Sequence, residues 1–561
     1  MREERKAQLR YARALLMRGR YGEILKRTAQ AVRTEVGRLL GRTDEAAYRV
    51  WIAERERDVG PRVQPEPGEP RAQPLVSVLV PAGPLARRGF TMASIERQSY
   101  RNWELVAVGE LPEMLRAARG ELVALVLPGD ALLPRALERS VGALIDRPSA
   151  PLLYTDEGLL DAGGAPLRPR FKPDWSPDTL LSLPYTGQLT LFRRALADGL
   201  GGLRAGLSPA AALYDLTLRL TEHGTPLHLP ELLYQRRLPG PASASREWID
   251  VVTAAIERRG LDASAEPGLA GPMSVAVRRT IRGQPSVAIV VPFRNRVELL
   301  ERCIASVRER SSYRNYHILA VDNGSDDPAT LAYLRTLAGD PAIRVLHYPE
   351  RFNFAAINNF AAEQTEAELL LLLNNDTEVL NRDWIEALLE HAQRPEVGIA
   401  GARLFYPDGS LQHAGVVVGL AGLAGHPFDG WPDGGAGAST AAGYGGEVLA
   451  VRNVSAVTAA CAMIRRALYR EVGGMDAARF CISFNDVDLC LRLRAAGYLV
   501  VYTPHAELIH HTSASRGRSS NLVEDEFLRE RWAAQLDADP YYNPNLSLQV
   551  AYRPRFCERI L

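Results

Sequence analysis

The 561-residue sequence lacks several features that define whole classes of proteins. Its five cysteines are few, odd in number and not spaced as metal-ligand pairs, which excludes a disulfide-rich secreted domain and favours a reducing compartment. No apolar run approaches the roughly 20 residues of a membrane-spanning helix, and the chain opens on a basic, polar stretch unlike a secretory signal. The 67 basic and 66 acidic residues leave a net charge of +1, which argues against a dedicated nucleic-acid binder. We therefore expect a cytosolic protein with large hydrophobic cores.

Residues 1–73 are expected to form a helical N-terminal segment and a linker. The first 58 residues are rich in Ala, Leu, Arg and Glu and contain no proline, whereas residues 60–74 are rich in Pro, Gly and Glu. Twelve basic and four acidic residues between Arg2 and Arg42 make the segment strongly basic. It is either an amphipathic helix that contacts anionic lipid at the inner face of the cell membrane, or a solvated appendage that packs on the rest of the chain or on a partner.

Two later segments of the chain, residues 74–240 and 284–530, resemble each other. Three blocks recur in the same order: Val76–Pro81 and Val287–Pro292, Tyr100–Trp103 and Tyr313–Tyr316, and Asp215–Arg219 and Asp488–Arg492. Each copy alternates short apolar, β-branched stretches with helical ones, which predicts an α/β fold with two tandem, mostly parallel sheets flanked by helices. Residues 241–283 are expected to connect the copies, and residues 531–561 to form a C-terminal tail.

In the second copy, a polar cluster follows each of two predicted strands, and ligands bind at the carboxyl ends of strands in open α/β sheets. Asp322 could accept hydrogen bonds from a nucleobase or ribose, although the Asn-Gly that follows it also predicts a turn. Asp376 suits a hard divalent cation that bridges nucleotide phosphates, or it caps the helix predicted over residues 383–393. The clusters that follow the strands 318–321 and 369–373 are Asp322-Asn323 and Asn374-Asn375-Asp376.

Two further groups of ionisable side chains lie near the end of the second copy. Asp486 and Asp488 precede an apolar helical pattern, so one of them could cap the helix while the other acts as a general base. His510 and His511 follow an apolar stretch and could complete a metal site or form a surface pair. Arg516, a few residues further on, could contact a diphosphate.

Seven ordered blocks of the second copy, taken together, resemble the glycosyltransferase family 2 proteins with a GT-A fold. These blocks are Val291–Asn295, Val321–Ser325, Asn353–Asn358, Asn374–Asp376, Gln412–Gly415, Val457–Cys461 and Asn485–Arg492. More narrowly, the chain is similar to bacterial tandem-domain transferases of cell-surface polysaccharide assembly, including rhamnosyltransferase-like proteins. The resemblance implies two tandem GT-A-like domains. It also implies inverting, metal-dependent transfer of a sugar from a nucleotide-diphosphate donor to a hydroxyl of a surface glycan or its lipid-linked precursor.

The resemblance also implies a role for each matching residue. Asp322 would bind the nucleotide, Asp376 would hold Mg²⁺ or Mn²⁺, and Asp486 would be the catalytic base. Asn374 stands where the metal motif of the family has its first aspartate. The remaining assignments are His511 or His510 as a further metal ligand, and Pro292, Asn323, Asn358, Asn374, Asn375 and Arg516 on the donor side.

A Gly- and Ala-rich stretch, residues 419–446, carries the side chains of His426, Phe428, Trp431 and Tyr444. The stretch is either a mobile lid on the acceptor side, where aromatic faces contact sugar rings, or a flexible surface insertion. We place three residues on the acceptor side: His426, Trp431 and Asp488.

The first copy lacks most of the chemical groups of the second. Gly109 replaces the nucleotide-binding aspartate, Leu213 replaces the base beside a retained Asp215, and only Asp130 remains of the metal motif. We therefore expect a degenerate domain that packs against the second copy, binds acceptor glycan or mediates dimerisation.

Two other classes of function compete with a glycosyltransferase. A non-catalytic glycan-binding or scaffold protein of the same pathway would have no need of three intact aspartates. A sugar-nucleotide dehydrogenase or a nucleotidyltransferase would need a Gly-any-Gly-any-any-Gly turn after an opening strand or a Gly-Lys-Ser/Thr loop, and the sequence has neither. The sequence therefore favours a glycosyltransferase.

Overall fold

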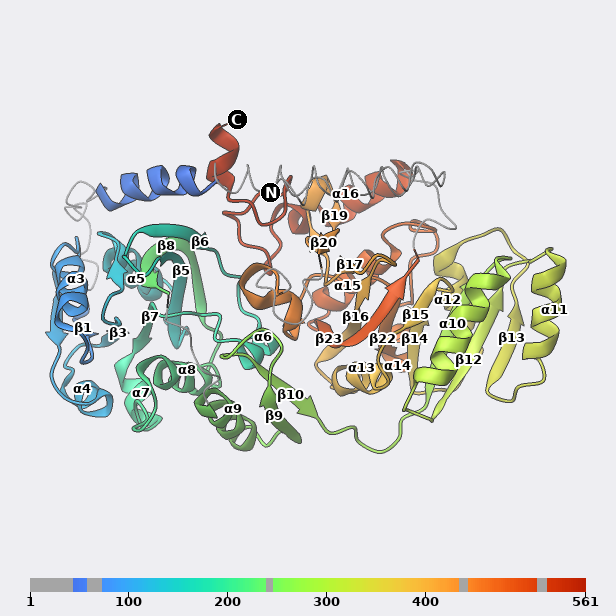
Figure 1. Ribbon diagram of the computed structural model, residues 1–561, viewed down its shortest axis with the longest axis horizontal. Helices are drawn as coiled ribbons and strands as arrows, with labels where there is room; N and C mark the ends of the chain where they lie inside the picture. Colours follow the sequence, from blue (N-terminus) through green and yellow to red (C-terminus); the bar gives the residue numbers. More distant parts are fainter. Residues whose placement is uncertain (1–43, 58–72, 239–245, 433–441, 512–521, 561) are drawn as a thin grey trace, which may run out of the picture.

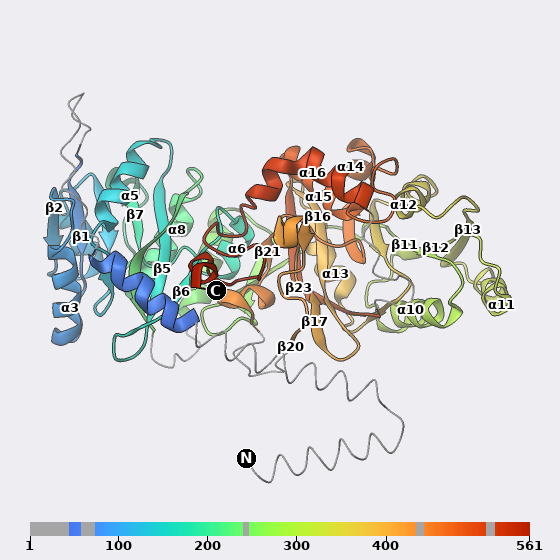
Figure 2. The same ribbon diagram turned by 90° about the horizontal axis from the view of Figure 1, so that it is seen from above.

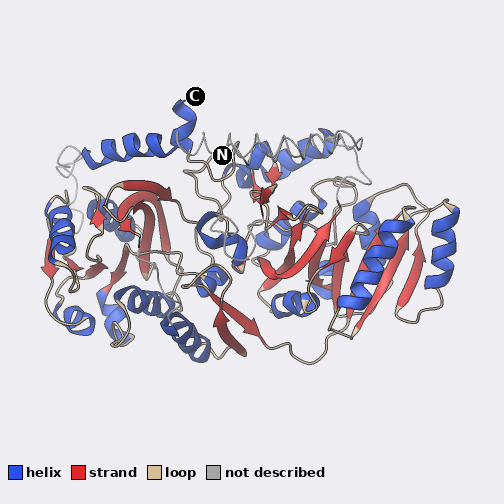
Figure 3. Ribbon diagram, viewed as in Figure 1, coloured by secondary structure: helices blue, strands red, loops and turns tan. Residues whose placement is uncertain are grey.

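The computed structural model describes residues 44–57, 73–238, 246–432, 442–511 and 522–560. They form two α/β units that lie side by side along an elongated molecule, each with a sheet flanked by helices (Figures 1 and 3). The basic stretch Arg2–Arg42 and the candidate Arg516 lie outside the described residues. None of the described helices is long and apolar enough to cross a membrane.

The first unit contains a sheet with the strand order β2-β1-β3-β7-β5-β8-β4, in which β6 pairs with β5. Its strands are β1 (Val76–Leu79), β2 (Trp103–Val106), β3 (Leu122–Leu125), β4 (Ala131–Leu132), β5 (Leu152–Leu160), β6 (Pro166–Arg170), β7 (Thr190–Arg193) and β8 (Leu227–Arg237). Its helices are α3 (Leu85–Glu96), α4 (Leu111–Ala117), α5 (Ala136–Ile145), α6 (Pro177–Ser182), α7 (Arg194–Gly199) and α8 (Pro209–Leu220). The central strands β1 and β3 are buried along their whole length and, apart from Ser77, apolar, as expected where helices cover both faces of a sheet.

Between the two units lie α9 (Arg246–Arg258), whose apolar face joins the core of the first unit, and a hairpin of β9 (Ala263–Pro267) and β10 (Val275–Arg279). The hairpin reaches the second unit because Arg278 Nη2 donates to Glu390 Oε1 at 2.7 Å. The predicted connecting segment is therefore structured and packs against both units.

The second unit contains a sheet with the order β13-β12-β11-β14-β22-β16, and β23 pairs with β16, β15 and β21. Its main strands are β11 (Val287–Phe293), β12 (Tyr316–Asp322), β13 (Ile343–His347), β14 (Leu369–Leu373), β15 (Thr377–Val379), β16 (Val397–Phe405), β22 (Cys461–Arg465) and β23 (Leu499–His510). Shorter strands are β17 (Ser410–His413), β18 (Val417–Val418), β19 (Ala424–Gly425), β20 (Trp431–Pro432) and β21 (Arg452–Asn453). The helices are α10 (Val297–Arg310), α11 (Pro328–Leu337), α12 (Phe354–Glu363), α13 (Trp384–Ala392), α14 (Arg466–Glu471), α15 (Asn485–Ala495) and α16 (Leu522–Asp537).

Seven strands of the second unit occupy the same places in their sheet as seven strands of the first: β12, β11, β14, β22, β16, β23 and β15 match β2, β1, β3, β7, β5, β8 and β4. The sheets are mixed, however, so the prediction of mostly parallel sheets is confirmed only in part. Strands β7 and β22 run antiparallel to both of their neighbours. Apolar composition and periodicity predict that a segment is a strand but do not predict its direction.

Each unit contains the same buried ion pair in its matching helix. In α8, Asp215 Oδ2 accepts a hydrogen bond from Arg219 Nη2 at 2.6 Å, and in α15, Asp488 Oδ2 accepts one from Arg492 Nε at 2.8 Å. Each arginine also donates to two carbonyls around the preceding Gly-Gly turn, at 2.7 Å in both bonds of Arg219 and at 2.6 and 2.7 Å in those of Arg492. The recurring sequence block therefore codes for a structural link between helix and turn.

The two units share a buried polar interface. Asp178, in α6 of the first unit, accepts hydrogen bonds from Arg394 Nη1 and Asn453 Nδ2 of the second unit, both at 2.7 Å. Burial alone would raise the pKa of the Asp178 carboxyl, but the charges of Arg394 and Arg279 bring it well below its usual range. A buried carboxylate that keeps its charge in this way ties the two units together.

The segment after α16 contacts both units. Asp539 accepts hydrogen bonds from Ser455 Oγ at 2.5 Å and from the N–H of Val418 at 2.8 Å, both in the second unit. Asn543 donates to the two carboxylate oxygens of Asp156, in the first unit, at 3.0 and 2.9 Å. The predicted C-terminal tail is thus part of the interface.

A helix of residues 44–57 lies on the first unit (blue in Figures 1 and 2). Its Tyr48 and Ile52 side chains are buried, and Tyr48 OH donates to Gln235 Oε1 in β8 at 3.4 Å. This part of the N-terminal segment therefore packs on the rest of the chain.

Candidate active site

The first candidate, Asp322, is the last residue of β12 and is 3% exposed. Its Oδ1 accepts a hydrogen bond from the N–H of Ser325 at 2.9 Å, and Oδ2 lies 3.3 Å from Nδ1 of His347. The N–H of Asn295, just after β11, donates to Ser325 Oγ at 2.8 Å, and Pro292 lies in the same strand β11. The turn after β12 and the loop after β11 therefore form one corner at the carboxyl end of the sheet.

Two predicted donor-side amides are held by the fold. Asn323 Nδ2 donates to the carbonyls of Tyr348 and Glu350, both at 2.8 Å, and Asn358 Nδ2 donates to the carbonyl of Phe354 at 2.8 Å within α12. The side-chain oxygen of each amide is buried and has no hydrogen-bond partner among the described residues. In each side chain, the amide N–H groups are thus bound to backbone carbonyls, and the amide oxygen remains as a hydrogen-bond acceptor.

The second candidate, Asp376, lies in the turn between β14 and β15 and is 6% exposed. Its Oδ1 is 3.1 Å from His510 Nε2, and Asn374 Nδ2 is 3.2 Å from the same nitrogen. His510 Nδ1 is 2.7 Å from Gln412 Oε1, an acceptor, so Nδ1 carries the proton and Nε2 of the neutral ring offers a lone pair. A lone pair on Nε2 beside a carboxylate oxygen is an arrangement suited to a shared cation.

His511 faces a different group of side chains. Its Nε2 lies 3.4 Å from Glu378 Oε2 and 3.5 Å from Arg302 Nη1, while its backbone N–H donates to the carbonyl of Asp376 at 2.8 Å. Of the two predicted histidines, only His510 therefore places its ring beside Asp376. Asn375 lies half-buried in the same turn as Asp376.

The third candidate, Asp486, lies half-buried in the first turn of α15, where the helix dipole stabilises negative charge. Its carboxylate accepts hydrogen bonds from the N–H groups of Ala459, at 3.1 Å, and Val487, at 2.9 Å. The next residue after Ala459, Ala460, accepts a backbone hydrogen bond from Asn374 at 3.0 Å. A short backbone bridge thus connects the loop that holds Asp486 to the turn that holds Asp376.

The three aspartates lie along one edge of the sheet. Strands β12, β11 and β14 are neighbouring and parallel, so Asp322 and the turn of Asp376 are about 10 Å apart, the distance of two strand spacings. Asp486 reaches the same edge through the backbone bridge to Asn374. The edge therefore brings together the carboxylate of Asp322, the contact between Asp376 and His510, and the carboxylate of Asp486.

Asp488, predicted on the acceptor side, requires a correction. It is 0% exposed, and in addition to Arg492 its carboxylate accepts hydrogen bonds from Arg531 Nη1 at 2.8 Å and Trp532 Nε1 at 3.0 Å. Three side chains hold it inside the protein, as the matching Asp215 is held by its own arginine. Asp488 is a structural residue and does not face an acceptor.

Aromatic side chains from the described parts of the stretch 419–446 pack into the core, whereas Ala421, Gly422, Asp429 and Gly430 are exposed and residues 433–441 lie outside the described residues. Phe428 is 0% exposed and stacks on Tyr552 with ring centroids 4.7 Å apart; Tyr444 stacks on the same ring, also at 4.7 Å. Trp431, predicted on the acceptor side, is half-buried and meets Phe428 edge to face at 5.3 Å. These aromatic side chains stabilise the unit through their mutual contacts.

His426, the other acceptor-side prediction, lies against a second histidine. Nδ1 of His426 is 2.8 Å from Nδ1 of His413, which ends β17. Burial lowers the pKa of both rings. The charges of His426, Arg452 and His510 lower the pKa of His413 further, whereas Asp486 and Asp429 partly offset the effect of burial on the pKa of His426. Sequence reasoning missed His413 and its neighbour Gln412 as site residues; the only signal was the Gln412–Gly415 block of the family resemblance.

The corresponding edge of the first unit is occupied by its own side chains. Asp130, which precedes β4 as Asp376 precedes β15, accepts hydrogen bonds from Tyr234 OH at 2.7 Å and from the N–H of Arg237 at 2.9 Å. Burial raises the pKa of Asp130 to about 7, although the two hydrogen bonds lower it. The Asp130 carboxyl therefore has a structural role in the first unit.

In the first unit, Ala131 of β4 pairs with Gln235 of β8, and in the second, Thr377 of β15 pairs with His510 of β23. Gln235 therefore occupies the position that His510 has in the second unit. Gln235 contacts Tyr48 of the helix 44–57, as described above, and the neighbouring Glu157 is buried in an ion pair with Lys172 Nζ at 3.2 Å. In the first unit, a polar and ionic cluster therefore fills the position that His510 has in the second unit.

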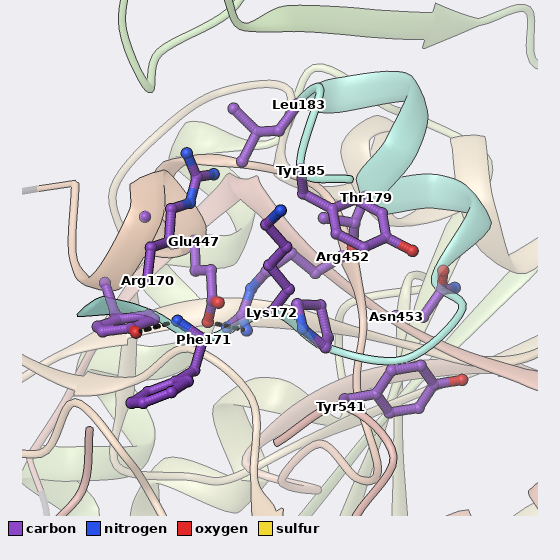
Figure 4. A pocket seen from close by; sticks show the side chains of 13 residues that line it. Arg170, Phe171, Lys172, Thr179, Leu183, Tyr185, Glu447, Arg452, Asn453 and Tyr541 are labelled. Carbon is purple, nitrogen blue, oxygen red and sulfur yellow. Dashed lines mark hydrogen bonds and ion pairs between the residues drawn. The ribbon is translucent and has the colours of Figure 1, made fainter. Parts of the chain in front are cut away.

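A pocket lies between the two units rather than at the edge described above (Figure 4). None of the predicted site residues lines it. It is a feature of the interface, lined from both units by residues that include Arg170, Lys172, Tyr185, Glu447, Arg452 and Asn453.

Comparison with known proteins relates the chain to several relatives. It is 35% identical over 577 residues to an uncharacterized protein, y4gI, of Sinorhizobium fredii. The alignment covers 92% of this chain and 62% of that protein. It is 37% identical over 554 residues to the O-antigen biosynthesis protein RfbC of Myxococcus xanthus. This alignment covers 90% of this chain and 43% of that protein. The chain thus spans less than two thirds of the length of both proteins.

A shorter relative is covered more fully. The N-acetylglucosaminyl-diphospho-decaprenol L-rhamnosyltransferase of Mycobacterium tuberculosis is 31% identical over 241 residues, which are 39% of this chain and 74% of that one. A model of the family described as glycosyl transferase family 2 matches residues 288–473, where Asp322 and Asp376 lie. The family resemblance expected from the sequence is therefore confirmed, and the chain belongs to glycosyl transferase family 2.

Proposed function

We propose that the second unit transfers a sugar from a nucleotide-diphosphate donor to a hydroxyl of a bacterial surface glycan or of its lipid-linked precursor, with inversion at the anomeric carbon. In this proposal residues 284–530 are the catalytic GT-A domain and residues 74–240 a degenerate copy of it. The observation that carries the proposal is the convergence of Asp376, His510 and Asp486 at the edge of the sheet where β12 ends in Asp322.

The donor nucleotide is assigned to the corner formed by the ends of β11 and β12. There Asp322 is held by the N–H of Ser325 and offers its remaining acceptor capacity to hydroxyl or N–H groups of a nucleoside. The buried, unpartnered oxygen of Asn323 in the next position is a further acceptor. Carboxylate and amide acceptors suit a ribose or a base, and the diphosphate would then extend toward Asp376.

The donor set beside Asp376 fits a divalent cation. Two adjacent ligands of one octahedral ion are about 3 Å apart when each lies about 2.1 Å from the ion, and Asp376 Oδ1 and His510 Nε2 are 3.1 Å apart. Among the described residues no three His, Cys, Asp or Glu side chains are grouped to hold an ion. Two protein ligands plus phosphate oxygens of a substrate is the usual arrangement for Mg²⁺. Bound Mg²⁺ or Mn²⁺ would offset the charge that develops on the leaving diphosphate.

Asp486 is assigned the role of general base. Its carboxylate takes the proton of the acceptor hydroxyl, the acceptor oxygen forms a bond to the anomeric carbon, and the bond from that carbon to the diphosphate oxygen breaks with its electron pair. Because bond formation and bond cleavage occur on opposite faces of the carbon, the configuration inverts. The two backbone N–H groups that bind Asp486 hold it in place without a competing positive charge.

The class of acceptor is supported by the names of two relatives, one an O-antigen biosynthesis protein and the other a transferase that acts on a diphospho-decaprenol substrate. The first unit is assigned a supporting role, because the places of Asp376 and His510 hold side chains that are tied into the fold. Its contribution is to pack against the catalytic unit through the Asp178 interface.

The proposal is tested by a screen of nucleotide sugars for release of nucleoside diphosphate, with and without Mn²⁺. We expect one nucleotide class to support release, Asp376→Asn to abolish the Mn²⁺ dependence, and Glu378→Gln to retain it, because Glu378 lies two residues away and contacts His511 instead. Release that is unchanged in Asp376→Asn, or absent with every nucleotide sugar in the intact protein, would contradict the proposed function.

A further inference from the structure

The histidine pair of His413 and His426 takes no part in the steps assigned above. The two Nδ1 atoms are 2.8 Å apart, the ring centroids are 4.9 Å apart, and the ring planes cross at 78°. His413 is almost fully buried at the end of β17, whereas His426 follows β19 and is half-buried. The pair therefore runs from the core toward the surface of the second unit.

The hydrogen bonds of His413 fix the tautomer of both rings. The N–H of Gly415, which can only donate, points to His413 Nε2 at 3.3 Å, so this nitrogen is an acceptor. Neutral His413 therefore carries its proton on Nδ1 and donates it to Nδ1 of His426. Nδ1 of His426 is then the acceptor, and the proton of the neutral ring is on Nε2.

The remaining nitrogen, Nε2 of His426, therefore carries the proton of the neutral ring and is a hydrogen-bond donor. The carboxylates of Asp486 and Asp429 raise the pKa of His426 and His510 lowers it, while Arg452 and His510 lower the pKa of His413. Asp429 already accepts a hydrogen bond from Tyr406 OH at 2.7 Å. The His426 ring is thus close enough to the proposed base, Asp486, for the charge of that carboxylate to raise its pKa.

We propose that His426 binds the acceptor, its Nε2–H donating a hydrogen bond to an oxygen of a polyhydroxylated sugar beside Asp486, and that His413 is a positioning residue that fixes the required tautomer. This inference rests on the proposed function of the second unit. During transfer the hydroxyl proton passes to Asp486, and His426 keeps its own proton. One neutral donor next to one carboxylate orients the acceptor oxygen without a positive charge that would pair with the base.

The test separates transfer to an acceptor from hydrolysis of the donor. The donor that the screen identifies is supplied with Mn²⁺ and either water alone or octyl glycosides as acceptors, and nucleoside diphosphate and glycosylated product are both measured. We expect His426→Ala to lower kcat/KM for the acceptor by about ten-fold, the loss of one hydrogen bond to substrate, and to leave hydrolysis without acceptor within about two-fold.

Matched variants preserve the hydrogen bonds in part. Glutamine places an amide N–H near the position of imidazole Nε2, so His426→Gln should restore transfer to within about three-fold of the unaltered protein. His413→Asn keeps a donor toward His426 and should resemble the unaltered protein, whereas His413→Leu should lose transfer but not hydrolysis. In ¹⁵N NMR spectra of the histidine rings, His413 should be protonated on Nδ1 and His426 on Nε2.

Three results would overturn the inference. The first is unchanged transfer in His426→Ala while the unaltered protein is active. The second is an equal loss of hydrolysis and transfer in both His426→Ala and His426→Gln, which would show a structural role. The third is the opposite tautomer in either ring, which the spectra report even for a variant that folds poorly. An unaltered protein that neither hydrolyses nor transfers any donor would contradict the proposed function itself and, with it, this role of His426.

Discussion

Asp486 and Asp488 are two positions apart in α15, yet their carboxylates have opposite environments. Asp486 is half-buried and receives hydrogen bonds from backbone N–H groups, whereas Asp488 is fully buried and bound by Arg492, Arg531 and Trp532. A carboxylate bound only by neutral donors can accept a proton from a substrate, but one paired with two arginines cannot do so readily. This difference supports the proposal that Asp486, and not Asp488, is the base.

Replacing Asp486 with asparagine should remove the base and leave the donor site intact. We expect kcat for transfer to fall by about 10² to 10⁴-fold, the usual contribution of a general base, with unchanged thermal stabilisation of the protein by the nucleotide. Steady-state kinetics and melting curves with nucleotide provide the two measurements. A variant that turns over near the normal rate would remove Asp486 from this role.

Asp130 in the first unit gives a residue-scale prediction about pH. Its pKa is about 7 in the folded protein because of burial, against about 3.9 in an unfolded chain. The folded state therefore binds the additional proton between these values, and its contribution to the free energy of unfolding is present at low pH and is lost as the pH rises from about 4 to about 7.

Urea denaturation at several pH values measures this contribution. Asp130→Asn should flatten the decrease of the unfolding free energy over that pH window, whereas Asp146→Asn, at an exposed position, should reproduce the unaltered curve. Identical pH dependence in the Asp130 variant and the unaltered protein would show that Asp130 is ionised in the fold over the whole window.

At the scale of elements, helices α8 and α15 show what the duplication preserves. In both helices an Asp–Arg pair binds the preceding Gly-Gly turn, and this link survives in the unit that lacks a base. This structural link is therefore retained in both copies, whereas the carboxylates that we propose for donor binding and catalysis occur in the second.

Asp488→Asn should consequently act on stability. Removing one partner of a buried ion pair leaves the arginines without their counter-charge, and we expect a loss of about 3 kcal/mol in the free energy of unfolding. Chemical denaturation measures the loss, and Glu530→Gln, at an exposed position of the neighbouring α16, is the matched control. Unchanged stability with abolished transfer would instead place Asp488 in the catalytic machinery.

At this same scale, the strands of the second unit and the residues at their ends could be predicted from the sequence. The apolar run of β14 predicted a buried strand, which the structure confirms. The choice between His510 and His511 could not be predicted, because successive side chains of a strand point to opposite faces. It depends on the register, in which Thr377 pairs with His510.

At the scale of the whole molecule, the packing of the two units depends on contacts that no local sequence pattern predicts. Asp178 of the first unit binds Arg394 and Asn453 of the second, and the residues after α16 contact both units. Such contacts join positions more than 200 residues apart, so periodicity and composition within a window carry no information about them. For the same reason the sequence predicted a tail where the structure has an interface, and gave no sign that Tyr48 packs against β8.

Arg394→Ala tests whether the two units unfold together. Loss of this arginine leaves Asp178 buried with only weaker partners and should weaken the interface by several kcal/mol. We expect the unaltered protein to show one calorimetric transition and the variant to show two, with Arg382→Ala, at an exposed position at the other end of α13, retaining one. A single transition at an unchanged temperature in Arg394→Ala would show that this ion pair does not couple the units.

The central claim is that the chain has one active site, in the second unit, centred on Asp376. Calorimetric titration of the whole chain with the active nucleoside diphosphate in the presence of Mn²⁺ tests it most directly. The account predicts one site per chain, lost in Asp376→Asn and retained in Asp130→Asn, the matching change in the first unit. Two sites per chain, or binding that is lost in Asp130→Asn and retained in Asp376→Asn, would contradict it.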